Sequence, residues 1–439
     1  MNFACWTITA VVILMESTSV DGLATKVLPR APTPPYILSN VPGTWAYDTM
    51  SRRVREEIIG RIFEENDLDA PDKAEAKAKM EALREELTEP QNHKLRYIEE
   101  DGGPDIEAWR EILTPYTECN WLDAPWCVTE FYLYRRIMEA FAYFKTSYDP
   151  FESQKQAGLT SSLASIEGLA EKLSSSNSLS LEAGLLLYIS TSLWGNRMDL
   201  SLWPVGEAVQ DDIFAQVLAA GSKNLLADDS EEMIEQIKSC IAGQSKRVDI
   251  VVDNAGFELI CDLCLADYLV SSGVAEKVVF QLKAHPTFVS DAMSKDMMWM
   301  IDTMAELDDE KYPFCKSTGL KWQSLVAEGK WELKENFFWV QPQPFWDIPE
   351  DLRSELGESS IVFVKGDANY RRLLGDRYWP LSTPFTDVAN YFPTRLCALR
   401  TLKAELGCGL LDDKVKEASE KDDKWMVSGR WGVIQFYNP

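Results

Sequence analysis

The stretch VDIVVDNAGFE, residues 248–258, decides the fold, because it passes from a strand-like apolar run through a turn to the start of a helix. Residues 248–252 are mostly β-branched and apolar, which is typical of a strand buried on both faces of a parallel sheet. The strand ends at Asp253 and Asn254, and the small residues 255–256 then allow a tight turn. Apolar residues spaced by three and four follow at once, so a helix is expected directly after the turn.

This arrangement places polar side chains where α/β proteins bind ligands. In an open α/β sheet, ligands occupy the crevice beyond the carboxyl ends of the strands, beside the N-terminus of the next helix. Asp253 and Asn254 occupy that position, and their carboxylate and amide groups are hard oxygen donors. The sequence therefore indicates a ligand site at the end of this strand.

Length and composition exclude several classes of protein. The chain has 439 residues, of which 46% are apolar, so it can form two or three domains with substantial cores. A formal net charge of −26 argues against nucleic acid and anionic membranes as partners, because both would be repelled.

Nine scattered cysteines are typical of reduced thiols, which favours a cytoplasmic location. His93 and His285 are the only histidines, so a histidine-rich metal site is excluded. Composition says nothing of the oligomeric state.

Three regions are predicted along the chain. Residues 1–30 are expected to be a disordered leader. The apolar run 3–15 is shorter than the roughly 20 residues that span a bilayer, and a signal peptide, the alternative for this run, is disfavoured because no basic residue precedes it. Residues 31–245 carry helical periodicity and are predicted to form a helical N-terminal domain. Residues 246–439 alternate strand-like and helix-like segments, which predicts a doubly wound α/β/α core with right-handed crossovers.

Polar residues follow three of the predicted strands in this core. Asp253 and Asn254 end the first, Asp291 follows the strand at 277–282, and Asp367 follows the strand at 361–364. Carboxylates and a carboxamide without Cys or His suit a hard divalent ion such as Mg or Mn. The sequence therefore predicts a metal site at one edge of the sheet.

Cationic residues accompany these oxygen donors and suit a phosphate: they are Lys365, Arg371, Arg400 and Lys403. A divalent ion and lysines together describe metal-assisted phosphoryl chemistry, in which both neutralise charge on the transferred group. Each residue alone is explained as well by a helix cap or a solvated charge. The convergence of the whole set on one sheet edge favours the functional interpretation.

Four segments carry a resemblance to a known family: DNAGFELICDL at 253–263, FVSD at 288–291, KGDANYRRLLGDRYW at 365–379 and RTLK at 400–403. They closely resemble the damage-control phosphatases, the family once called domain of unknown function eighty-nine. The RTxK signature resembles that of its third subfamily. Further similar segments extend the resemblance over residues 40–439.

The resemblance implies a fold and an activity. The expected fold is a helical N-terminal domain packed on an α/β metal-binding core. The expected activity is that of a phosphatase dependent on Mn, Co, Ni or Mg, which hydrolyses sugar phosphates such as fructose 1-phosphate and fructose 6-phosphate, and related damaged phosphometabolites. Small phosphorylated metabolites are thus the implied partners.

The resemblance also implies roles for single positions. Asp253, Asn254 and Asp291 match metal ligands, and Asp253, Asp291 and Lys403 would act in catalysis. The implied substrate-binding residues are Asp253, Asn254, Glu258, Asp291, Lys365, Asp367, Asn369, Tyr370, Arg371, Arg400 and Lys403. The segment LWGNRMDLS at 193–201 would bring Asn196 and Asp199 to the same cleft.

Some positions depart from the family pattern. Ala368 stands where the family usually has Leu in GDLNYR, and Gln281 and Thr287 replace a His and a Trp that are common before FVSD. None of the three matches a metal ligand. The reaction is therefore more firmly predicted than the substrate.

Two other functions are compatible with the sequence. A subfamily relative has been assigned a protein glutamate O-methyltransferase activity that uses S-adenosylmethionine, and Glu258 would serve it. The glycine-rich loop that a Rossmann methyltransferase requires is absent after Val252, however. A non-catalytic metabolite-binding protein is the second alternative, which the intact ligand positions disfavour.

Overall fold

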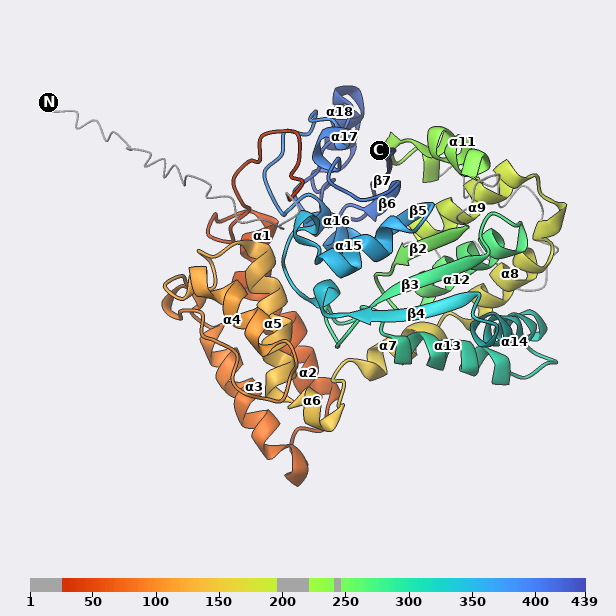
Figure 1. Cartoon of the computed structure of the whole chain (residues 1–439). Helices are drawn as coiled ribbons and strands as arrows, with labels where there is room; N and C mark the ends of the chain where they lie inside the picture. Colours follow the sequence, from red (N-terminus) through yellow and green to blue (C-terminus); the bar gives the residue numbers. More distant parts are fainter. Residues whose placement is uncertain (1–25, 196–220, 241–245) are drawn as a thin grey trace, which may run out of the picture.

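The computed structural model describes residues 26–195, 221–240 and 246–439 (Figure 1). At its centre these residues form a seven-stranded sheet of order β1-β7-β6-β5-β2-β3-β4. Strands β2 to β6 pair in parallel, whereas β7 runs antiparallel to β6 and parallel to β1. The strands are β1 (Leu225–Asp228), β2 (Arg247–Val251), β3 (Lys277–Lys283), β4 (Trp331–Asn336), β5 (Ile361–Lys365), β6 (Leu396–Thr401) and β7 (Gly432–Tyr437).

The strand order reverses between β2 and β5. From β2 the chain proceeds to β3 and β4 on one side, and it then returns to β5 and β6 on the other. Such a reversal opens a crevice at the carboxyl ends of the two strands. Asp253 follows β2 and Gly366 follows β5, so both lie at this crevice.

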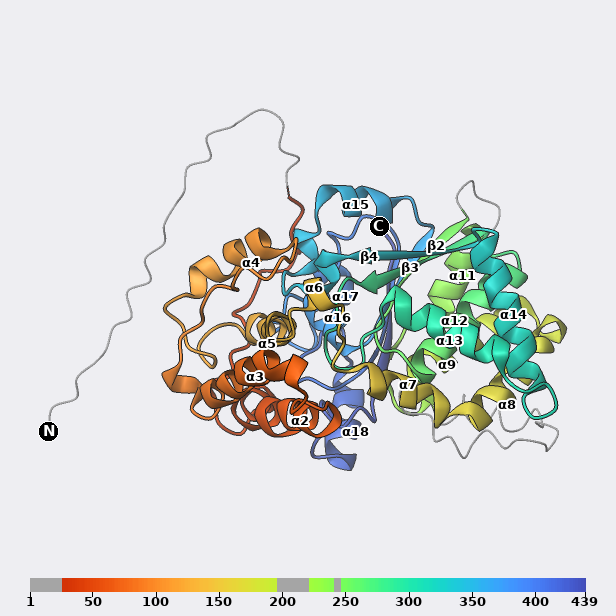
Figure 2. The same ribbon diagram turned by 90° about the horizontal axis from the view of Figure 1, so that it is seen from below.

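One face of the sheet is covered by helices that lie together in Figures 1 and 2. Side chains alternate between faces along a strand, and accordingly Val248 and Ile250 of β2 pack into this layer while Val251 packs into the opposite one. The covering helices are α8 (Leu163–Ser174), α9 (Leu181–Trp194), α11 (Ser230–Cys240), α12 (Phe257–Ser271), α13 (Ser294–Glu306) and α14 (Pro313–Ala327). Helix α7 (Glu152–Thr160) precedes these helices in the chain and comes directly after the N-terminal helices.

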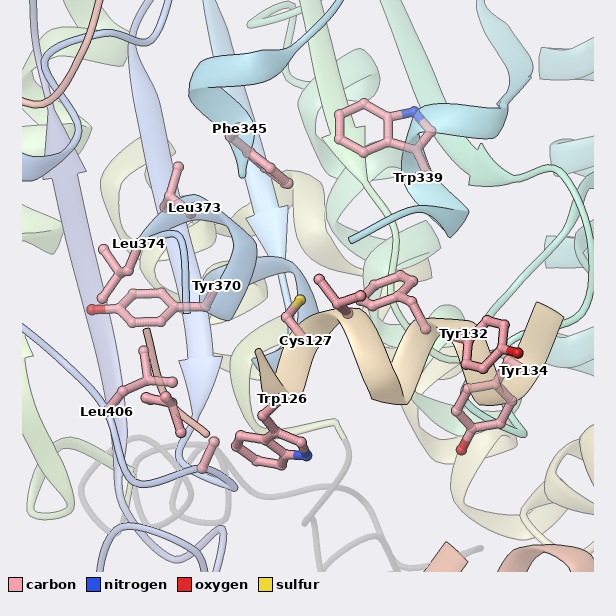
Figure 3. Packing of buried hydrophobic residues seen from close by; sticks show 14 of the residues in the cluster. Trp126, Cys127, Tyr132, Tyr134, Trp339, Phe345, Tyr370, Leu373, Leu374 and Leu406 are labelled. Atoms are coloured by element: carbon pink, nitrogen blue, oxygen red, sulfur yellow. The ribbon is translucent and has the colours of Figure 1, made fainter. Parts of the chain in front are cut away.

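The opposite face carries a second apolar layer that also includes the N-terminal helices. Helix α5 (Trp126–Ala140) lies within this layer, and all of its residues are buried. Figure 3 shows part of this packing, with Trp126, Cys127, Tyr132 and Tyr134 on α5. Its neighbours in the N-terminal part are α1 (Trp45–Asp48), the π-helix η1 (Thr49–Ile59), α2 (Gly60–Glu65), α3 (Ala74–Glu86), α4 (Ile106–Leu113) and α6 (Tyr143–Thr146). From the core come α15 (Glu350–Gly357), α16 (Asp367–Leu373) and α17 (Phe385–Val388), and α18 (Asp412–Lys421) lies near the C-terminus.

The predicted boundary at residue 245 requires correction. Residues 31–245 were expected to form one helical domain, but this stretch contains strand β1, which pairs with β7 in the central sheet. Helices α8 and α9 share an apolar cluster with β2 and α12. Helical periodicity shows that one side of a helix is apolar without showing what it packs against, so α8, α9 and α11 could not be assigned to the sheet from the sequence.

The predicted α/β class is confirmed, with helices on both faces of a mostly parallel sheet. The strands expected at 248–252, 277–282 and 361–364 appear as β2, β3 and β5. No helix in the described part of the chain is long and apolar enough to cross a membrane.

Candidate active site

The end of β2 forms the floor of the candidate site. Asp253 is buried, and the Asn254 amide donates hydrogen bonds of 2.8 Å to both Asp253 Oδ2 and Glu258 Oε2. Gly256 has a φ of 74°, a left-handed conformation that favours glycine and that turns the chain into α12. Because Glu258 lies in the first turn of α12, the turn brings all three polar side chains together.

The loop after β3 adds Asp291 to this floor. Phe288 and Val289 both have positive φ values, 45° and 69°, which are uncommon for residues with bulky side chains. The loop is held to the β2 end by a bridge between Asn254 and Asp291 and by a 2.6 Å hydrogen bond from the Ser290 hydroxyl to Asn254 Oδ1. The structure thus brings the three sequence-predicted metal ligands into one place.

The electrostatics of this floor favour a cation. Burial raises the pKa of Asp253 well above its usual value, and the nearby charges of Asp291 and Glu258 raise it further. Burial also raises the pKa of Asp291 to about 6, although Lys283 opposes this shift. Lys283 Nζ lies 3.3 Å from Asp291 Oδ2 and is itself buried. Two carboxylates that are costly to ionise side by side would be stabilised by a bound positive ion.

The donor set fits a hard divalent ion. Among the described residues, no group of three or more His, Cys, Asp or Glu side chains is placed to hold a metal. The candidate set instead combines two carboxylates, from Asp253 and Asp291, with the Asn254 carboxamide. Oxygen donors of this kind suit Mg or Mn, and water or phosphate oxygens would complete the coordination.

The end of β5 closes the site from the other side of the crevice. Gly366 has a φ of 84°, and a Cβ at this position would lie 2.0 Å from Asp253 Oδ2. Only glycine therefore allows the two strand ends to approach so closely. The next residue, Asp367, accepts hydrogen bonds from Arg400 Nε at 2.7 Å and from the Lys403 backbone N–H at 3.0 Å. Asp367 thereby fixes the backbone that presents the Lys403 side chain.

Three of the four predicted cations are neutralised inside the protein. Lys365 forms an ion pair of 3.1 Å with Asp262 and also donates to the Ser192 carbonyl. Arg371 is bound to Glu130 and Asp376, and Arg400 is bound to Asp367 and to the carbonyls of residues 404 and 406. Of these three side chains only Arg371 lines the cleft.

Two further predicted residues lie behind the cleft wall. The Asn369 amide donates to the carbonyls of Val252 and Lys365 and accepts a 3.1 Å hydrogen bond from Lys283. The Tyr370 hydroxyl donates to Gln435, and its ring lies among the apolar side chains shown in Figure 3. In this structure both side chains support the site rather than line it. The predicted Asn196 and Asp199 lie outside the described residues.

Lys403 is different from the other cations. It lines the cleft, and its ammonium group has no ion pair or hydrogen bond with any residue that the structure describes. Its charge is close enough to Asp253 to lower the pKa of that carboxyl, against the larger effect of burial. An unpaired ammonium beside buried carboxylates is placed to meet an anion that binds over them.

These groups lie at the bottom of a cleft of about 1180 Å³. One wall is the sheet edge, with Asp253, Asp291 and Lys403, and the other comes from the N-terminal helices. Residues of η1, α2 and α5 form that second wall, among them Arg53 and Glu130. The cleft therefore joins the two parts of the chain, and both are needed to enclose a ligand.

Comparisons with known proteins identify the family. The damage-control phosphatase ARMT1-like domain matches residues 49–418. The chain belongs to this damage-control phosphatase family. Damage-control phosphatase ARMT1 of Danio rerio is 34% identical over 366 residues, which cover 77% of this chain and 81% of that protein. Its namesake from Homo sapiens is 34% identical over 339 residues, 73% of this chain and 76% of that protein.

The relative from Xenopus tropicalis, also named damage-control phosphatase ARMT1, is 32% identical over 442 residues, 92% of this chain and 98% of that protein. A solved DUF89 family protein from Pyrococcus horikoshii is 16% identical and covers 81% of this chain and 97% of its own, with a TM-score of 0.42. The family match over residues 49–418 and the relatives at 32–34% identity confirm the predicted membership in the damage-control phosphatase family.

Sequence reasoning missed two features of this candidate site. Lys283 links Asp291 to Asn369 from the last position of β3, where a lysine looks like the polar end of a strand. The wall from α5 was assigned only to the predicted helical N-terminal domain and not to the site. A carboxylate, Glu130, in the middle of a buried stripe was the signal that could have found it.

Proposed function

We propose that this protein is a metal-dependent phosphatase that hydrolyses sugar phosphates. The observation that carries the proposal is the unpaired Lys403 ammonium beside the buried carboxylates of Asp253 and Asp291. The names of the relatives support a phosphatase active in metabolite repair. Fructose 1-phosphate and fructose 6-phosphate are the substrates that the family resemblance favours.

Each residue of the floor has a part in the proposed reaction. Asp253, Asn254 and Asp291 would hold the divalent ion, for which Mn, Co, Ni and Mg are the candidates. When bound, the ion supplies positive charge against the phosphoryl oxygens and the leaving oxygen. Lys403 binds the phosphate from the other side, and Asp367 holds the Lys403 backbone in position.

The surrounding side chains keep this arrangement fixed. Lys283 pairs with Asp291 and Asn369, so the Asp291 carboxylate is oriented before a substrate arrives. Gly366 leaves room for the Asp253 carboxylate at the crevice. Because the charged groups are already in position, they need not reorganise during the reaction. This preorganisation is the main source of electrostatic catalysis.

Two variants test the proposal. Asp253→Ala and Asp291→Ala should each lower phosphate release from fructose 1-phosphate by at least about 10²-fold with Mn or Co present. In chelator, their thermal unfolding should be unchanged or shifted upward, because a costly buried carboxylate is removed. Asp267→Asn serves as a control, since Asp267 is a buried carboxylate of α12 outside the cleft.

The same assay separates the alternative functions. Phosphate release that stops in chelator and returns with metal supports a phosphatase. Methyl transfer from S-adenosylmethionine without phosphate release would support a methyltransferase, and binding of fructose 1-phosphate without any turnover would support a metabolite-binding protein. Full activity of Asp291→Ala in chelator would contradict the metal assignment.

A further inference from the structure

Helix α5 presents three polar side chains to the cleft at a spacing of four residues. Trp126, Glu130 and Tyr134 all line the cleft opposite the sheet edge. Residues four apart lie on one face of a helix, so the three form a continuous strip. Figure 3 shows Trp126 and Tyr134 extending to the same side of α5. We call these three residues the α5 strip.

The strip contains hydrogen-bonding groups that the protein does not use. The indole Nε1 of Trp126 is buried and has no hydrogen-bond partner among the described residues. A buried donor without a partner costs about 1–3 kcal/mol, which a ligand hydroxyl group could recover. Other tryptophans of the described chain also have an unpartnered Nε1, but of these only Trp126 lines the cleft. The Tyr134 hydroxyl likewise makes no hydrogen bond within the described chain, whereas that of Tyr132, on the same helix, donates to the Arg96 carbonyl at 2.8 Å.

The strip is rigidly attached to the candidate active site. Arg371 of α16 binds the Glu130 carboxylate, and its guanidinium lies 3.5 Å from the centre of the Trp126 ring. Asp376 holds Arg371 with bonds of 2.8 and 3.1 Å and also accepts a 2.9 Å hydrogen bond from the Cys127 backbone N–H. The same helix, α16, begins at the end of β5 that closes the site.

The cleft has more room than a phosphate needs. Its volume of about 1180 Å³ is slightly above the range of about 300–1,000 Å³ that is typical of pockets for small organic ligands, and the phosphate-binding groups occupy only its floor. The organic part of a substrate would therefore extend from the floor toward the α5 strip. An indole donor, a carboxylate acceptor and a phenol, set beside aromatic rings, offer partners for several hydroxyl groups on a carbon chain.

We propose that Trp126, Glu130 and Tyr134 bind hydroxyl groups of the substrate and select polyhydroxylated phosphate esters. The inference rests on the proposed phosphatase function and assigns the specificity of the same cleft to α5. A site built to hydrogen-bond hydroxyl groups rejects ligands that lack them, because its polar groups are then left buried and unpaired. A purely structural role for the strip would affect all substrates alike.

Steady-state kinetics on two phosphate esters tests this inference. Fructose 1-phosphate carries hydroxyl groups on its organic part, and p-nitrophenyl phosphate carries none. Trp126→Phe and Tyr134→Phe each remove one hydrogen-bonding group while keeping an aromatic ring. Each should lower the ratio of kcat/KM for fructose 1-phosphate to kcat/KM for p-nitrophenyl phosphate by about 10-fold.

Tyr132→Phe is the matched control. It removes a buried tyrosine hydroxyl from the same helix, but Tyr132 does not line the cleft. This variant should lose some stability and keep the wild-type ratio. The inference would be overturned if the ratio of the two kcat/KM values stayed at its wild-type value in both Trp126→Phe and Tyr134→Phe, whether or not both activities fell.

Direct binding separates this inference from the proposed reaction. If the wild-type protein hydrolyses neither ester with any of the four metals, the proposed function fails, and calorimetric titration then tests the strip. Fructose 1-phosphate should bind about 10-fold more weakly to Trp126→Phe than to wild type, while the affinity for inorganic phosphate stays the same. Parallel weakening of both ligands, or of neither, would overturn the specificity role.

Discussion

Lys403 is the single residue on which phosphate capture is expected to depend. In a protein of net charge −26, the buried carboxylates of the site would repel a phosphate dianion, and salt does not screen them at this distance. Lys403→Gln removes the one unpaired cation that the described part of the cleft floor contains. It should raise KM and lower kcat for fructose 1-phosphate, a loss of about 2–4 kcal/mol in kcat/KM, measured with saturating Mn or Co.

Two further variants define what Lys403 does. Lys403→Arg should restore only part of the activity, because a planar guanidinium does not replace a compact ammonium in a tight site. Lys416→Gln removes an exposed charge of α18 and should leave the kinetics unchanged. An unaltered kcat/KM in Lys403→Gln would remove this residue from the site.

Single residues were predictable from the sequence where their position depends on local structure. Asp253 and Asn254 directly follow an apolar strand, so their place at the sheet edge could be predicted before the structure was known. Ion pairing depends instead on partners far along the chain. Arg371 binds Glu130, 241 residues away, and nothing local to either residue indicates that the charge of Arg371 is already neutralised.

At the scale of elements, three interior strands, β2, β3 and β5, were predicted from the sequence, and the edge strands β1 and β4 were not. Strands β2 and β5 lie inside the sheet, and most of their residues are apolar, as is typical of a strand that is covered on both faces. Strand β4 lies at the edge, and its sequence WELKEN is mostly polar because much of it is partly exposed. β1, at the other edge, has only four residues, too few to show a period.

Buried contacts link Ser192 of α9 and Lys365 of β5 to Asp262 of α12. They predict that the free energy of unfolding depends on pH. Burial raises the pKa of Asp262 to about 6, against the opposing charge of Lys365. The folded protein therefore binds more protons than the unfolded chain between about pH 4 and pH 6, and the free energy of unfolding falls as the pH rises through this range. A shift of this size corresponds to about 3 kcal/mol.

Asp262→Asn isolates this contribution from that of other carboxylates. Urea unfolding between pH 4 and pH 6.5 should show a shallower loss of stability in the variant than in wild type, because the amide does not titrate. Ser192→Ala, which removes a 2.6 Å hydrogen bond to Asp262, should steepen the loss instead. Identical pH profiles for all three proteins would show that Asp262 is ionised without cost.

At the scale of the whole molecule, one apolar layer unites the N-terminal helices with the sheet. The cluster that contains Ile137 of α5 also contains Val251 of β2 and Val362 of β5. Helical periodicity in residues 31–245 indicates that each helix has an apolar side, but a sequence does not reveal which surface that side meets. The predicted division into a helical part and a separate core is therefore replaced by a single packed unit.

This shared layer predicts that the chain unfolds as one cooperative unit. Ile137→Ala creates a cavity in α5 and should cost about 2–5 kcal/mol. If the layer couples the two parts, hydrogen exchange should show this same loss of free energy at the slowest-exchanging amides of β2 and β5, although neither strand is altered. Ile301→Ala, a matched change in α13 on the opposite face of the sheet, should lower protection in α5 in the same way. Wild-type protection of β2 in Ile137→Ala would instead show that the helices and the sheet unfold separately.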